Sequence, residues 1–572
     1  MSWSPKRSVA DANALLVAPG APHETETRLI DGRLLRVYKN QWPSLRVFWL
    51  WALSQHKEAV YLVYENQSYT FGQVHNRAVK AASVLRHVYG VQKGDRVAVC
   101  ARNYPEYIVA FWACHLIGAV SVLANAWSPL QVLRHCLIRT QCKVIIVDAE
   151  RADRLEPIVS DFTKEAGTTG VLAIEAHEGK GQWNGVRSWN DALDDYRGPL
   201  IPIADDPGVV PEDNASILFT SGTTGLPKGV LSTQRQWLTN VMNVSVASRR
   251  AVLRRGEDPP ALALPSGPQK GILISVPFFH VTGSTSLAML ATMGGMKIVM
   301  MRKWIPEQAA RLIEAHNVTV AGGVPSMVSD LVDKSNGKWH LEALLFGGAP
   351  APDMLPRRAQ KAFPAAALSQ GYGLTETNSV AVGFAAEDYA ARPKSCGLAS
   401  PVNDLAIVKD GVVVPPGVVG EVWIKGPNVM QCYWNDTAAT DKEGFLYIRD
   451  RIKDIIIRGG ENIDSVSVEN ALYADDRVLE VAAVGVPDAR LGELVAAVVS
   501  IKPPYHGKVN EAQLLKHAQD ALPKFAVPVI VIIQNEPFER TPSGKILKAE
   551  LRELAKKHWE LRKAQQNPAP RL

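Results

Sequence analysis

The sequence predicts an α/β protein in which a large N-terminal domain of layered α/β sub-domains precedes a small α+β C-terminal domain. Apolar runs of strand length alternate with helical patterns through most of the 572 residues, which is typical of buried, largely parallel strands. Near residues 450–454 (Asp-Arg-Ile-Lys-Asp) the pattern changes to shorter α+β units. The length also exceeds what one hydrophobic core supports, and suggests about three to four core-sized units. We therefore expect one domain over residues 1–450 and a second over residues 451–572.

Each expected element follows from its own local pattern. In the large domain, short apolar runs predict strands at residues 143–148, 216–220, 297–301 and 343–346. The apolar run at residues 47–53 is too short to span a bilayer, and we interpret it as the buried face of a helix. Residues 179–214 are rich in Gly, Pro and Asp and predict a surface connection, and residues 249–271 predict an irregular, solvated insert. In the small domain we expect strands at 481–486, 494–501 and 529–533, and a closing helix at 549–566.

Composition excludes several classes of protein. Apolar residues make up 47% and charged residues 21% of the chain, which is typical of a globular protein. The net charge is +6 and the basic residues are scattered, so nucleic acid is not indicated as a partner. The six cysteines form no CxxC pair and show no His/Cys ligand spacing, which predicts neither a zinc site nor a disulfide framework.

These features also bear on where the protein acts. The cysteine pattern and the lack of a signal-like start favour a cytoplasmic protein without a transmembrane segment. The alternative is a peroxisomal protein, because the final Pro570-Arg571-Leu572 loosely matches the Ser-Lys-Leu address. Peripheral contact with a membrane and the oligomeric state stay open at this point.

The strongest chemical signal is the strip at residues 219–230, Phe-Thr-Ser-Gly-Thr-Thr-Gly-Leu-Pro-Lys-Gly-Val. Its glycines allow backbone N–H groups to approach phosphate oxygens, while its hydroxyls and Lys228 supply further donors and positive charge. The spacing does not fit a Walker loop, because the second glycine and the lysine are not arranged as G-x4-G-K-[ST]. We interpret the strip as a polyphosphate-binding loop rather than as a simple glycine-rich turn, which needs far fewer special residues.

A second motif lies at residues 370–377, Gln-Gly-Tyr-Gly-Leu-Thr-Glu-Thr. Tyr372 is suited to stack on a base, Thr375 to bind a phosphate, and Glu376 to hold Mg²⁺, which prefers oxygen ligands. The motif is not a dinucleotide fingerprint, because the third glycine is absent.

Three shorter pieces accompany these motifs. Residues 277–283 contain His280 among apolar residues, a setting in which a histidine is more often a satisfied core residue than a catalytic one. The glycines of residues 346–350 would admit a flat ligand against the backbone, and a strand-to-loop turn explains them equally well. Lys545 lies on a Pro/Gly turn before the last expected helix, where a cation would meet charge that develops on a reacting carboxylate and α-phosphate.

Taken in this order, the motifs resemble those of the AMP-forming acyl-CoA synthetases of the adenylate-forming superfamily. This superfamily also contains the 4-coumarate-CoA ligases, the luciferases and the adenylation domains of peptide synthetases. The resemblance covers roughly residues 68–554, and its most specific parts are the strip at 221–229 and the Lys545 turn. It implies an acid–thiol ligase that uses ATP, Mg²⁺ and coenzyme A and acts on a small-molecule carboxylic acid.

The resemblance also implies a role for individual residues. The phosphate loop that closes over ATP consists of Thr220, Ser221, Gly222, Thr223, Thr224, Gly225 and Lys228. The residues along the adenine, the acyl carboxylate and the α-phosphate are Gly347, Gly348, Ala349, Gln370, Gly371, Tyr372, Gly373 and Thr375. Glu376 is implied as the magnesium ligand, and His280 as the residue that lines the acyl pocket and gates the pantetheine channel. The residues implied near the hinge and in the small domain are Asp450 and Arg451 at the ribose, Lys453 as the hinge, Gly459 and Gly460 at CoA, and Lys545 for adenylation.

The implied reaction has two halves. The carboxylate attacks the α-phosphate to give an acyl-adenylate and pyrophosphate, and the CoA thiol then attacks that mixed anhydride. Neutralisation of charge by Mg²⁺ and lysine would lower the first barrier, and holding the reactants together would lower both. In this family the small domain rotates between the halves, so we expect a mobile C-terminal domain.

One departure from the family pattern precedes Asp450. The family has a segment whose aspartate grips the ribose and then a hairpin, whereas residues 437–443 here run almost directly into residues 444–450. About a strand pair of chain is missing, which leaves Asp450 to serve as both the ribose aspartate and the aspartate before the hinge. The loss of a charged hydrogen bond costs about 1.5–3 kcal/mol, so a weakly active or non-catalytic homologue is an alternative.

The acid itself is less well defined by the sequence. We expect a pocket lined by residues 280–284, 322–325, 346–349 and 378–380, which are small, mostly uncharged and without a cation for a second carboxylate. This favours a medium- or long-chain fatty acid, with an aryl or cinnamate-type acid as the alternative. A stand-alone adenylation module that loads a carrier protein is a further alternative, although no carrier domain follows residue 554.

Overall fold

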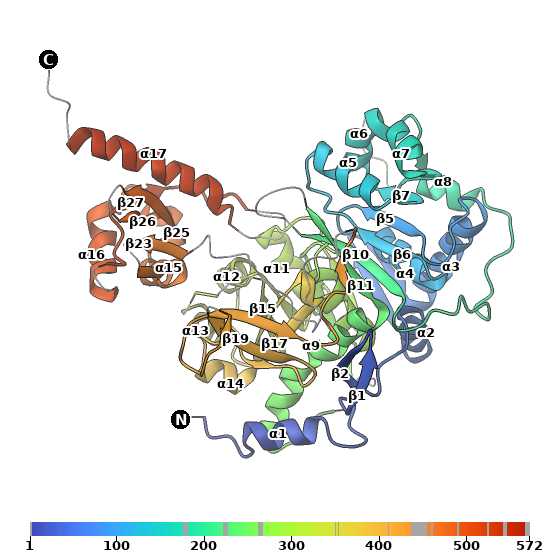
Figure 1. Cartoon of the computed structure of the whole chain (residues 1–572), viewed down its shortest axis with the longest axis horizontal. Helices are drawn as coiled ribbons and strands as arrows, with labels where there is room; N and C mark the ends of the chain where they lie inside the picture. The colour runs from blue at the N-terminus through green and yellow to red at the C-terminus, as the bar shows by residue number, and fades with distance from the viewer. Residues whose placement is uncertain are drawn as a thin grey trace. The chain divides into compact units, whose positions relative to one another are not determined.

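The computed structural model divides the chain into two compact units, and Figure 1 labels many of their elements. It describes residues 3–174, 181–220, 227–260, 267–348, 351–352, 354–409, 411–435, 455–458, 461–488, 491–522, 525–540 and 546–566. The first unit comprises Met1–Gly323, Met327–Gly348 and Ala359–Ile448, and the second comprises Val324–Ser326, Ala349–Arg358 and Arg449–Leu572. A mixed α/β first unit and a smaller α+β second unit agree with the predicted fold class.

The first unit contains an eight-stranded sheet with a parallel centre and an antiparallel edge. Its strands are, in spatial order, β22 (Cys432–Tyr433), β11 (Lys228–Thr233), β10 (Asn214–Thr220), β6 (Val120–Leu123), β5 (Arg96–Cys100), β7 (Val144–Val147), β8 (Gly170–Ala173) and β9 (Arg187–Ser188). All four residues of β6 and of β7 are buried, as expected for parallel strands covered on both faces. The two ends of the predicted phosphate strip lie where β10 ends and antiparallel β11 begins.

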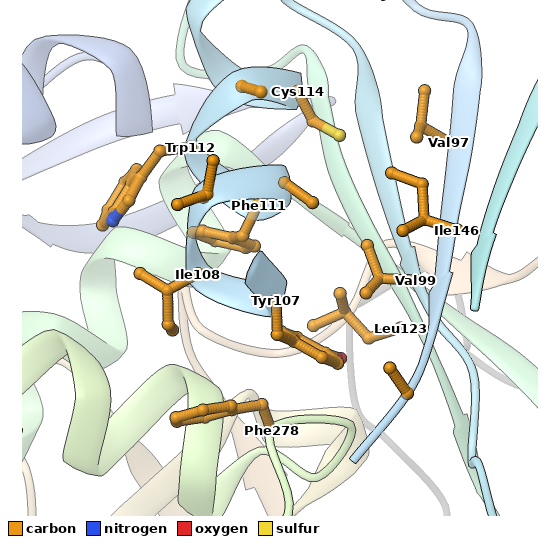
Figure 2. Packing of buried hydrophobic residues seen from close by; sticks show 14 of the residues in the cluster. Val97, Val99, Tyr107, Ile108, Phe111, Trp112, Cys114, Leu123, Ile146 and Phe278 are labelled. Carbon is orange, nitrogen blue, oxygen red and sulfur yellow. The ribbon is translucent and has the colours of Figure 1, made fainter. Parts of the chain in front are cut away.

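Helix α4 (Pro105–Leu116) is the central element of the main core. Pro105 occupies its first turn, where a missing N–H costs nothing, and every residue of the helix except Glu106 is buried. Figure 2 shows Tyr107 and Cys114 of α4 on the side of the β-strand residues Val97, Val99, Leu123 and Ile146, and Trp112 on the opposite side of the helix. Trp112 stacks there on Trp49 of α2 (Leu45–His56), with 4.6 Å between ring centroids. The core therefore continues through both faces of one helix.

A nine-stranded sheet forms the second layer of the first unit. Its strands are, in spatial order, β18 (Leu398–Ala399), β17 (Ser379–Ala385), β16 (Ala367–Leu374), β15 (Ala343–Gly347), β14 (Val320–Gly323), β12 (Gly271–Ile274), β13 (Lys297–Met300), β3 (Val60–Tyr64) and β4 (Gln67–Thr70). The strands from β16 to β3 pair in parallel, and the outer pairs at each edge are antiparallel. The parallel strands consequently end at one common edge of the sheet, where loops gather functional residues in α/β folds.

Helices and two small sheets complete the first unit. The further helices are α1 (Val9–Leu16), α3 (Phe71–His87), α5 (Leu130–Arg139), α6 (Ala149–Leu155), α7 (Val159–Ala166), α8 (Trp189–Asp194), α9 (Gln234–Arg254), α10 (Met289–Met293), α11 (Pro306–Ala315) and α14 (Ala386–Ala391). Helices α12 (Pro325–Lys334) and α13 (Leu355–Ala362) belong to the first unit from Met327 and from Ala359 onward, and their first residues are assigned to the second unit. The small sheets are the hairpin of β1 (Thr25–Ile30) and β2 (Arg33–Tyr38), and the trio of β19 (Asp404–Lys409), β20 (Val412–Val413) and β21 (Glu421–Lys425). Thr70 and Thr233 cap α3 and α9 with capping boxes, so local sequence sets where both helices begin.

The second unit is a five-stranded sheet with apolar clusters on both faces. Its elements are β23 (Ile455–Arg458), β24 (Glu461–Asp464), α15 (Ser465–Tyr473), β25 (Val478–Asp488), β26 (Gly492–Ile501), α16 (Glu511–Ala521), β27 (Ile530–Gln534) and α17 (Lys548–Gln566). Along β25, Val481 and Ala483 pack with residues of α15 and α16, whereas Ala482 and Val484 pack with residues of α17. The period of two along the strand thus assigns one helix layer to each face.

Most of the elements predicted from the sequence are confirmed. The strands expected at 143–148, 216–220, 297–301 and 343–346 correspond to β7, β10, β13 and β15, and the run at 47–53 lies in α2. The strands and the closing helix expected in the small domain correspond to β25, β26, β27 and α17. Among the described residues, no helix combines the length and the apolar character needed to cross a bilayer.

Two predictions about irregular segments are wrong in part. The supposed surface connection at 179–214 contains β9 and α8, and Trp189 of α8 is buried. The supposed insert at 249–271 begins inside α9, where Arg250 and Arg254 are buried rather than solvated. Arg254 forms an ion pair with Asp388 at 2.6 Å. A helix end rich in arginine resembles a solvated loop in composition. Only the hydrogen-bond acceptors of the arginines, which lie far away in the sequence, show that these side chains are buried.

Candidate active site

The two ends of the phosphate strip meet at the tip of an antiparallel strand pair. Thr220 ends β10 and Lys228 begins β11, and the register places them opposite each other. The Thr220 hydroxyl donates to the Lys228 carbonyl oxygen at 3.5 Å. Gly229 next to them is required by a close approach, because an added Cβ would lie 2.9 Å from Ile217 and 3.4 Å from Trp434. Residues 221–226 lie outside the described residues, so the site is built here from the two ends of the strip, which we call its anchors.

Glu376 lies in a single turn, Thr375–Thr377, directly after β16. The turn is tied internally, since the Thr377 hydroxyl accepts from the Leu374 amide at 2.8 Å and donates to the Ser379 carbonyl at 2.9 Å. Asn378 then adopts a left-handed conformation, with φ of 52°. This is a conformation that asparagine tolerates better than most residues.

Asn428 fastens this turn from outside. Its side-chain amide donates to the Thr377 carbonyl at 2.8 Å, and the side-chain amide of Asn378 donates to the Asn428 carbonyl at 2.9 Å. Both asparagines are fully buried. The Met430 amide donates to the Glu376 carbonyl at 2.7 Å, so the backbone that carries Glu376 is held on several sides.

Tyr433 brings the phosphate strip and Glu376 to one place. Its hydroxyl donates to Glu376 Oε1 at 2.7 Å, and the Lys228 ammonium lies over its ring, 4.8 Å from the centroid. Strand β22 pairs with β11 so that Tyr433 lies opposite Val230, which is two residues after Lys228. A cation suited to phosphate and a carboxylate suited to Mg²⁺ therefore share one aromatic side chain.

The residues expected to contact the nucleobase and the acyl group lie at the common edge of the nine-stranded sheet. Gly347 ends β15 opposite Gly371 of β16, and Gly348 follows with φ of 77°. Gln370 is buried and accepts from the Tyr389 hydroxyl at 3.3 Å. Burial raises the pKa of Tyr389, which keeps this hydroxyl protonated as a donor.

Gly323 and His280 reach the same edge. Gly323 ends β14 opposite Phe346, and an added Cβ there would lie 3.1 Å from Val276, near the start of the His280 segment. The His280 ring lies 4.9 Å from that of Phe279. The His280 carbonyl accepts from the Ser284 hydroxyl at 3.0 Å, at the start of the π-helix Thr282–Ala288. His280 therefore lies at a turn beside the expected acyl pocket.

A buried polar layer flanks this part of the site. Ser286 donates to the Ser379 hydroxyl at 2.8 Å. Asn240 of α9 donates to the Thr285 carbonyl at 2.9 Å and accepts from the Val380 amide at 2.7 Å. The layer connects α9, the π-helix and β17 around the residues expected to line the pocket.

The sequence reasoning missed Tyr433, Asn428 and Asn240. The run Tyr433-Trp-Asn-Asp436 served only as a landmark, and nothing in it indicates a bond to a carboxylate 57 positions earlier in the chain. Contacts of this range come from tertiary structure.

The roles of all the predicted site residues stay predictions, and several of these residues lie outside the described ones. They are Ser221, Gly222, Thr223, Thr224, Gly225, Ala349, Asp450, Arg451, Lys453, Gly459, Gly460 and Lys545.

The donor set around Glu376 fits a shared magnesium ion rather than a metal cage. In the part of the chain that the structure describes, no group of three or more His, Cys, Asp or Glu side chains is arranged to hold a metal. Mg²⁺ is commonly bound by one or two carboxylates together with the phosphates of a substrate. Glu376, beside a phosphate strip, offers the protein part of such a site.

The sequence matches two families of known proteins in consecutive segments. Residues 49–434 match the family described as AMP-binding enzyme, and residues 467–545 match the AMP-binding enzyme C-terminal domain. Among curated proteins, the chain is 31% identical to a 2-succinylbenzoate–CoA ligase of Bacillus cereus, over 86% of this chain and 94% of that protein. It is 30% identical to a feruloyl-CoA synthase of Amycolatopsis sp., over 89% and 98% of the two chains.

Solved structures of CoA synthetases also match most of the chain. An o-succinylbenzoate CoA synthetase from Bacillus subtilis in complex with its acyl-adenylate intermediate matches with a TM-score of 0.71 and 25% identity, over 89% of this chain and 98% of that chain. The same enzyme in complex with ATP and magnesium matches with a TM-score of 0.69 and 25% identity, over 89% and 99%. A Mycobacterium tuberculosis fatty acyl CoA synthetase matches with a TM-score of 0.62 and 27% identity, over 90% and 99%.

Proposed function

The chain belongs to the family of AMP-binding enzymes, and from this premise we propose that it is an ATP-dependent acid–CoA ligase that acts through an acyl-adenylate. The observation that carries the proposal is the arrangement of Lys228, Tyr433 and Glu376 at the anchors of the phosphate strip. A site for a magnesium–triphosphate complex needs a carboxylate for the metal and a cation for the phosphates. Glu376 and Lys228 provide these two groups, and both contact Tyr433. The relatives that bind ATP with magnesium or an acyl-adenylate support the same reading.

The proposed reaction uses these residues in two steps. An oxygen of the acid attacks the α-phosphorus, and the bond to the bridging oxygen breaks to release pyrophosphate. The CoA sulfur then attacks the acyl carbon, AMP leaves, and the thiol proton passes to solvent. Lys228 binds the departing phosphates, Thr375 orients the α-phosphate, and Gln370 and Tyr372 hold the adenine. When bound at Glu376, Mg²⁺ neutralises phosphate charge and so favours the first step.

The small domain is proposed to complete the site from residues 451–572. Lys545 is assigned to the adenylation half, Lys453 to the hinge, and Gly459 and Gly460 to CoA. Lys545→Ala is therefore expected to abolish ATP–pyrophosphate exchange but to retain thioester formation from supplied acyl-adenylate. Loss of both halves in a folded variant would contradict the assignment.

For the acid, we propose an aryl or arylalkenyl monocarboxylic acid. The two curated relatives named above are a 2-succinylbenzoate–CoA ligase and a feruloyl-CoA synthase. The segments expected to line the pocket contain no lysine or arginine for the second carboxylate of a succinylbenzoate.

A medium- or long-chain fatty acid is the second candidate, as the sequence alone favoured. It is supported by the small, uncharged residues of the pocket segments and by the match to a fatty acyl CoA synthetase. The shortened segment before Asp450 favours a third candidate, a weakly active or non-catalytic homologue.

The test is ATP–pyrophosphate exchange with ferulate, 2-succinylbenzoate, octanoate and palmitate, followed by AMP release with and without CoA. We expect exchange with ferulate to exceed that with either fatty acid by about tenfold or more, and AMP release to require CoA. Faster exchange with a fatty acid would replace the aryl proposal by the second candidate. No exchange with any of the four acids would favour the third candidate, and turnover only with a carrier protein would remove the CoA ligase.

A further inference from the structure

We propose that Tyr433 is a positioning residue that orients Glu376 for Mg²⁺ through its hydroxyl and steadies Lys228 through its ring. The inference rests on the proposed function, because it concerns how the same site receives a magnesium–nucleotide complex. It assigns two separable tasks to one side chain, and each task can be removed by its own substitution.

The hydroxyl acts on the carboxylate. It donates to Glu376 Oε1 at 2.7 Å, which is a normal length for a hydrogen bond to a carboxylate. A carboxylate that binds a metal must present its oxygens in a fixed direction, and hydrogen bonds from neighbouring groups set this direction. The backbone of Glu376 is already fixed by the Met430 amide, so the remaining freedom lies in the side-chain torsions that Tyr433 restrains.

The ring acts on the lysine. The Lys228 ammonium lies 4.8 Å from the ring centroid, within the range of a cation–π contact. Lysine has a long, flexible side chain, and a contact near its ammonium reduces the freedom that phosphate binding would otherwise remove. The register of β11 and β22 makes this contact a consequence of strand pairing, because Tyr433 lies opposite Val230.

The neighbours of Tyr433 hold the short strand β22 in position. The Trp434 amide donates to the Gly229 carbonyl at 2.7 Å, and the Trp434 indole donates to the Arg139 carbonyl at 3.0 Å. The Gln431 amide donates to the Leu231 carbonyl at 3.0 Å. Tyr433 is therefore flanked on both sides by backbone bonds to β11, which gives its side chain the rigidity that a positioning residue needs.

Two substitutions separate the tasks. Tyr433→Phe removes the hydroxyl and keeps the ring, whereas Tyr433→Leu removes both. The measurement is the calorimetric affinity for a non-hydrolysable ATP analogue, α,β-methylene-ATP, in excess Mg²⁺ and in EDTA. The ratio of the two affinities reports on the metal, and the affinity in EDTA reports on the lysine and the rest of the site.

For Tyr433→Phe we expect the gain in affinity on adding Mg²⁺ to fall by about ten- to a hundredfold, with the affinity in EDTA unchanged. For Tyr433→Leu we expect the same loss in the gain on adding Mg²⁺. We also expect its nucleotide affinity in EDTA to fall by about two- to fivefold. Tyr61→Phe is the matched control, because the Tyr61 hydroxyl hydrogen-bonds Thr292 at 2.7 Å in the buried core. It is expected to lower stability and to leave both affinities unchanged.

The outcomes distinguish this inference from the proposed function. If the wild type binds the analogue and Tyr433→Phe keeps its full response to Mg²⁺, the role of the hydroxyl is overturned. If Phe and Leu variants bind equally in EDTA, the role of the ring is overturned. A folded wild type that binds no nucleotide and exchanges no pyrophosphate overturns the proposed function and, with it, both roles.

Discussion

Replacing Gly373 by alanine is expected to destabilise the first unit strongly, whereas the same change at Gly371 is expected to be tolerated. Both glycines lie on β16, two positions apart, in the motif Gln370-Gly-Tyr-Gly-Leu. An added Cβ at Gly371 would lie 3.5 Å from Val380, an ordinary van der Waals contact. At Gly373 it would overlap the Ser379 carbonyl oxygen and lie 3.0 Å from the Thr377 hydroxyl. The pairing of β16 with β17 changes register at this point, between Tyr372 and Gly373.

The magnitude follows from what must move. Because the overlap at Gly373 is with backbone, β17 must shift away from β16, and overpacking of this kind costs about 1–3 kcal/mol. The shift also strains the bonds from Thr377 to the Leu374 amide and to the Ser379 carbonyl, each worth about 1 kcal/mol. We expect a loss of about 3–5 kcal/mol for Gly373→Ala. Gly371→Ala is expected to stabilise by up to about 1 kcal/mol, because it reduces the entropy of the unfolded chain.

The assay is urea denaturation followed by circular dichroism and tryptophan fluorescence, on the full chain without nucleotide. Stability is measured rather than activity, because both glycines belong to the predicted nucleotide site. A difference between the two variants below about 1 kcal/mol would refute the reasoning, since it would mean that the bulge accommodates a methyl group. The ATP–pyrophosphate exchange activity of Gly373→Ala should also fall, because the turn that carries Glu376 starts at Thr375, two residues after the substituted position.

Two further predictions concern buried charge and pH. Arg254→Ala should cost about 3–5 kcal/mol, because it leaves Asp388, whose side chain is only 12% exposed, without its main partner. Arg392→Ala should cost under about 1 kcal/mol, since that side chain is 62% exposed, and urea denaturation compares the two variants. Burial lowers the pKa of His23 to about 4 while the unfolded chain keeps about 6.5, so the unfolded state gains the proton first. The free energy of unfolding should therefore fall by about 2–3 kcal/mol between pH 7 and 4.5, and by less in His23→Gln; equal slopes would contradict this.

Much of the fold was predictable from the sequence because its signals are local. The β7 run Val144–Val147 is apolar throughout, and α4 begins at a proline and is apolar all round, so burial on both faces could be inferred. The phosphate strip also supported the prediction of strand β10 before it, because a flexible loop rich in glycine and hydroxyl groups needs a rigid element to fix its position. The expected fold class needed no knowledge of distant contacts.

The candidate site was less predictable, and the reason is physical. The residues by themselves indicated Lys228 as a phosphate cation and Glu376 as a metal carboxylate, and only the resemblance implied that the two meet at one ATP. Their meeting depends on Tyr433, which hydrogen-bonds one and lies under the other. The prediction that the arginines at the end of α9 are solvated was wrong for the same reason. Asp388, the ion-pair partner of Arg254, lies 134 positions away in the sequence.

The position of Tyr433 follows from the antiparallel edge of the eight-stranded sheet. Strand β11 follows β10 directly along the chain, and the two ends of the strip lie where these strands pair. Strand β22 takes its antiparallel place beside β11 from far later in the chain. Glu376 follows the last parallel strand of the other sheet, where β16 turns into antiparallel β17. The Tyr433 hydrogen bond thus joins the antiparallel margins of two sheets, so a change that breaks β22 pairing should weaken the phosphate and the metal contacts together.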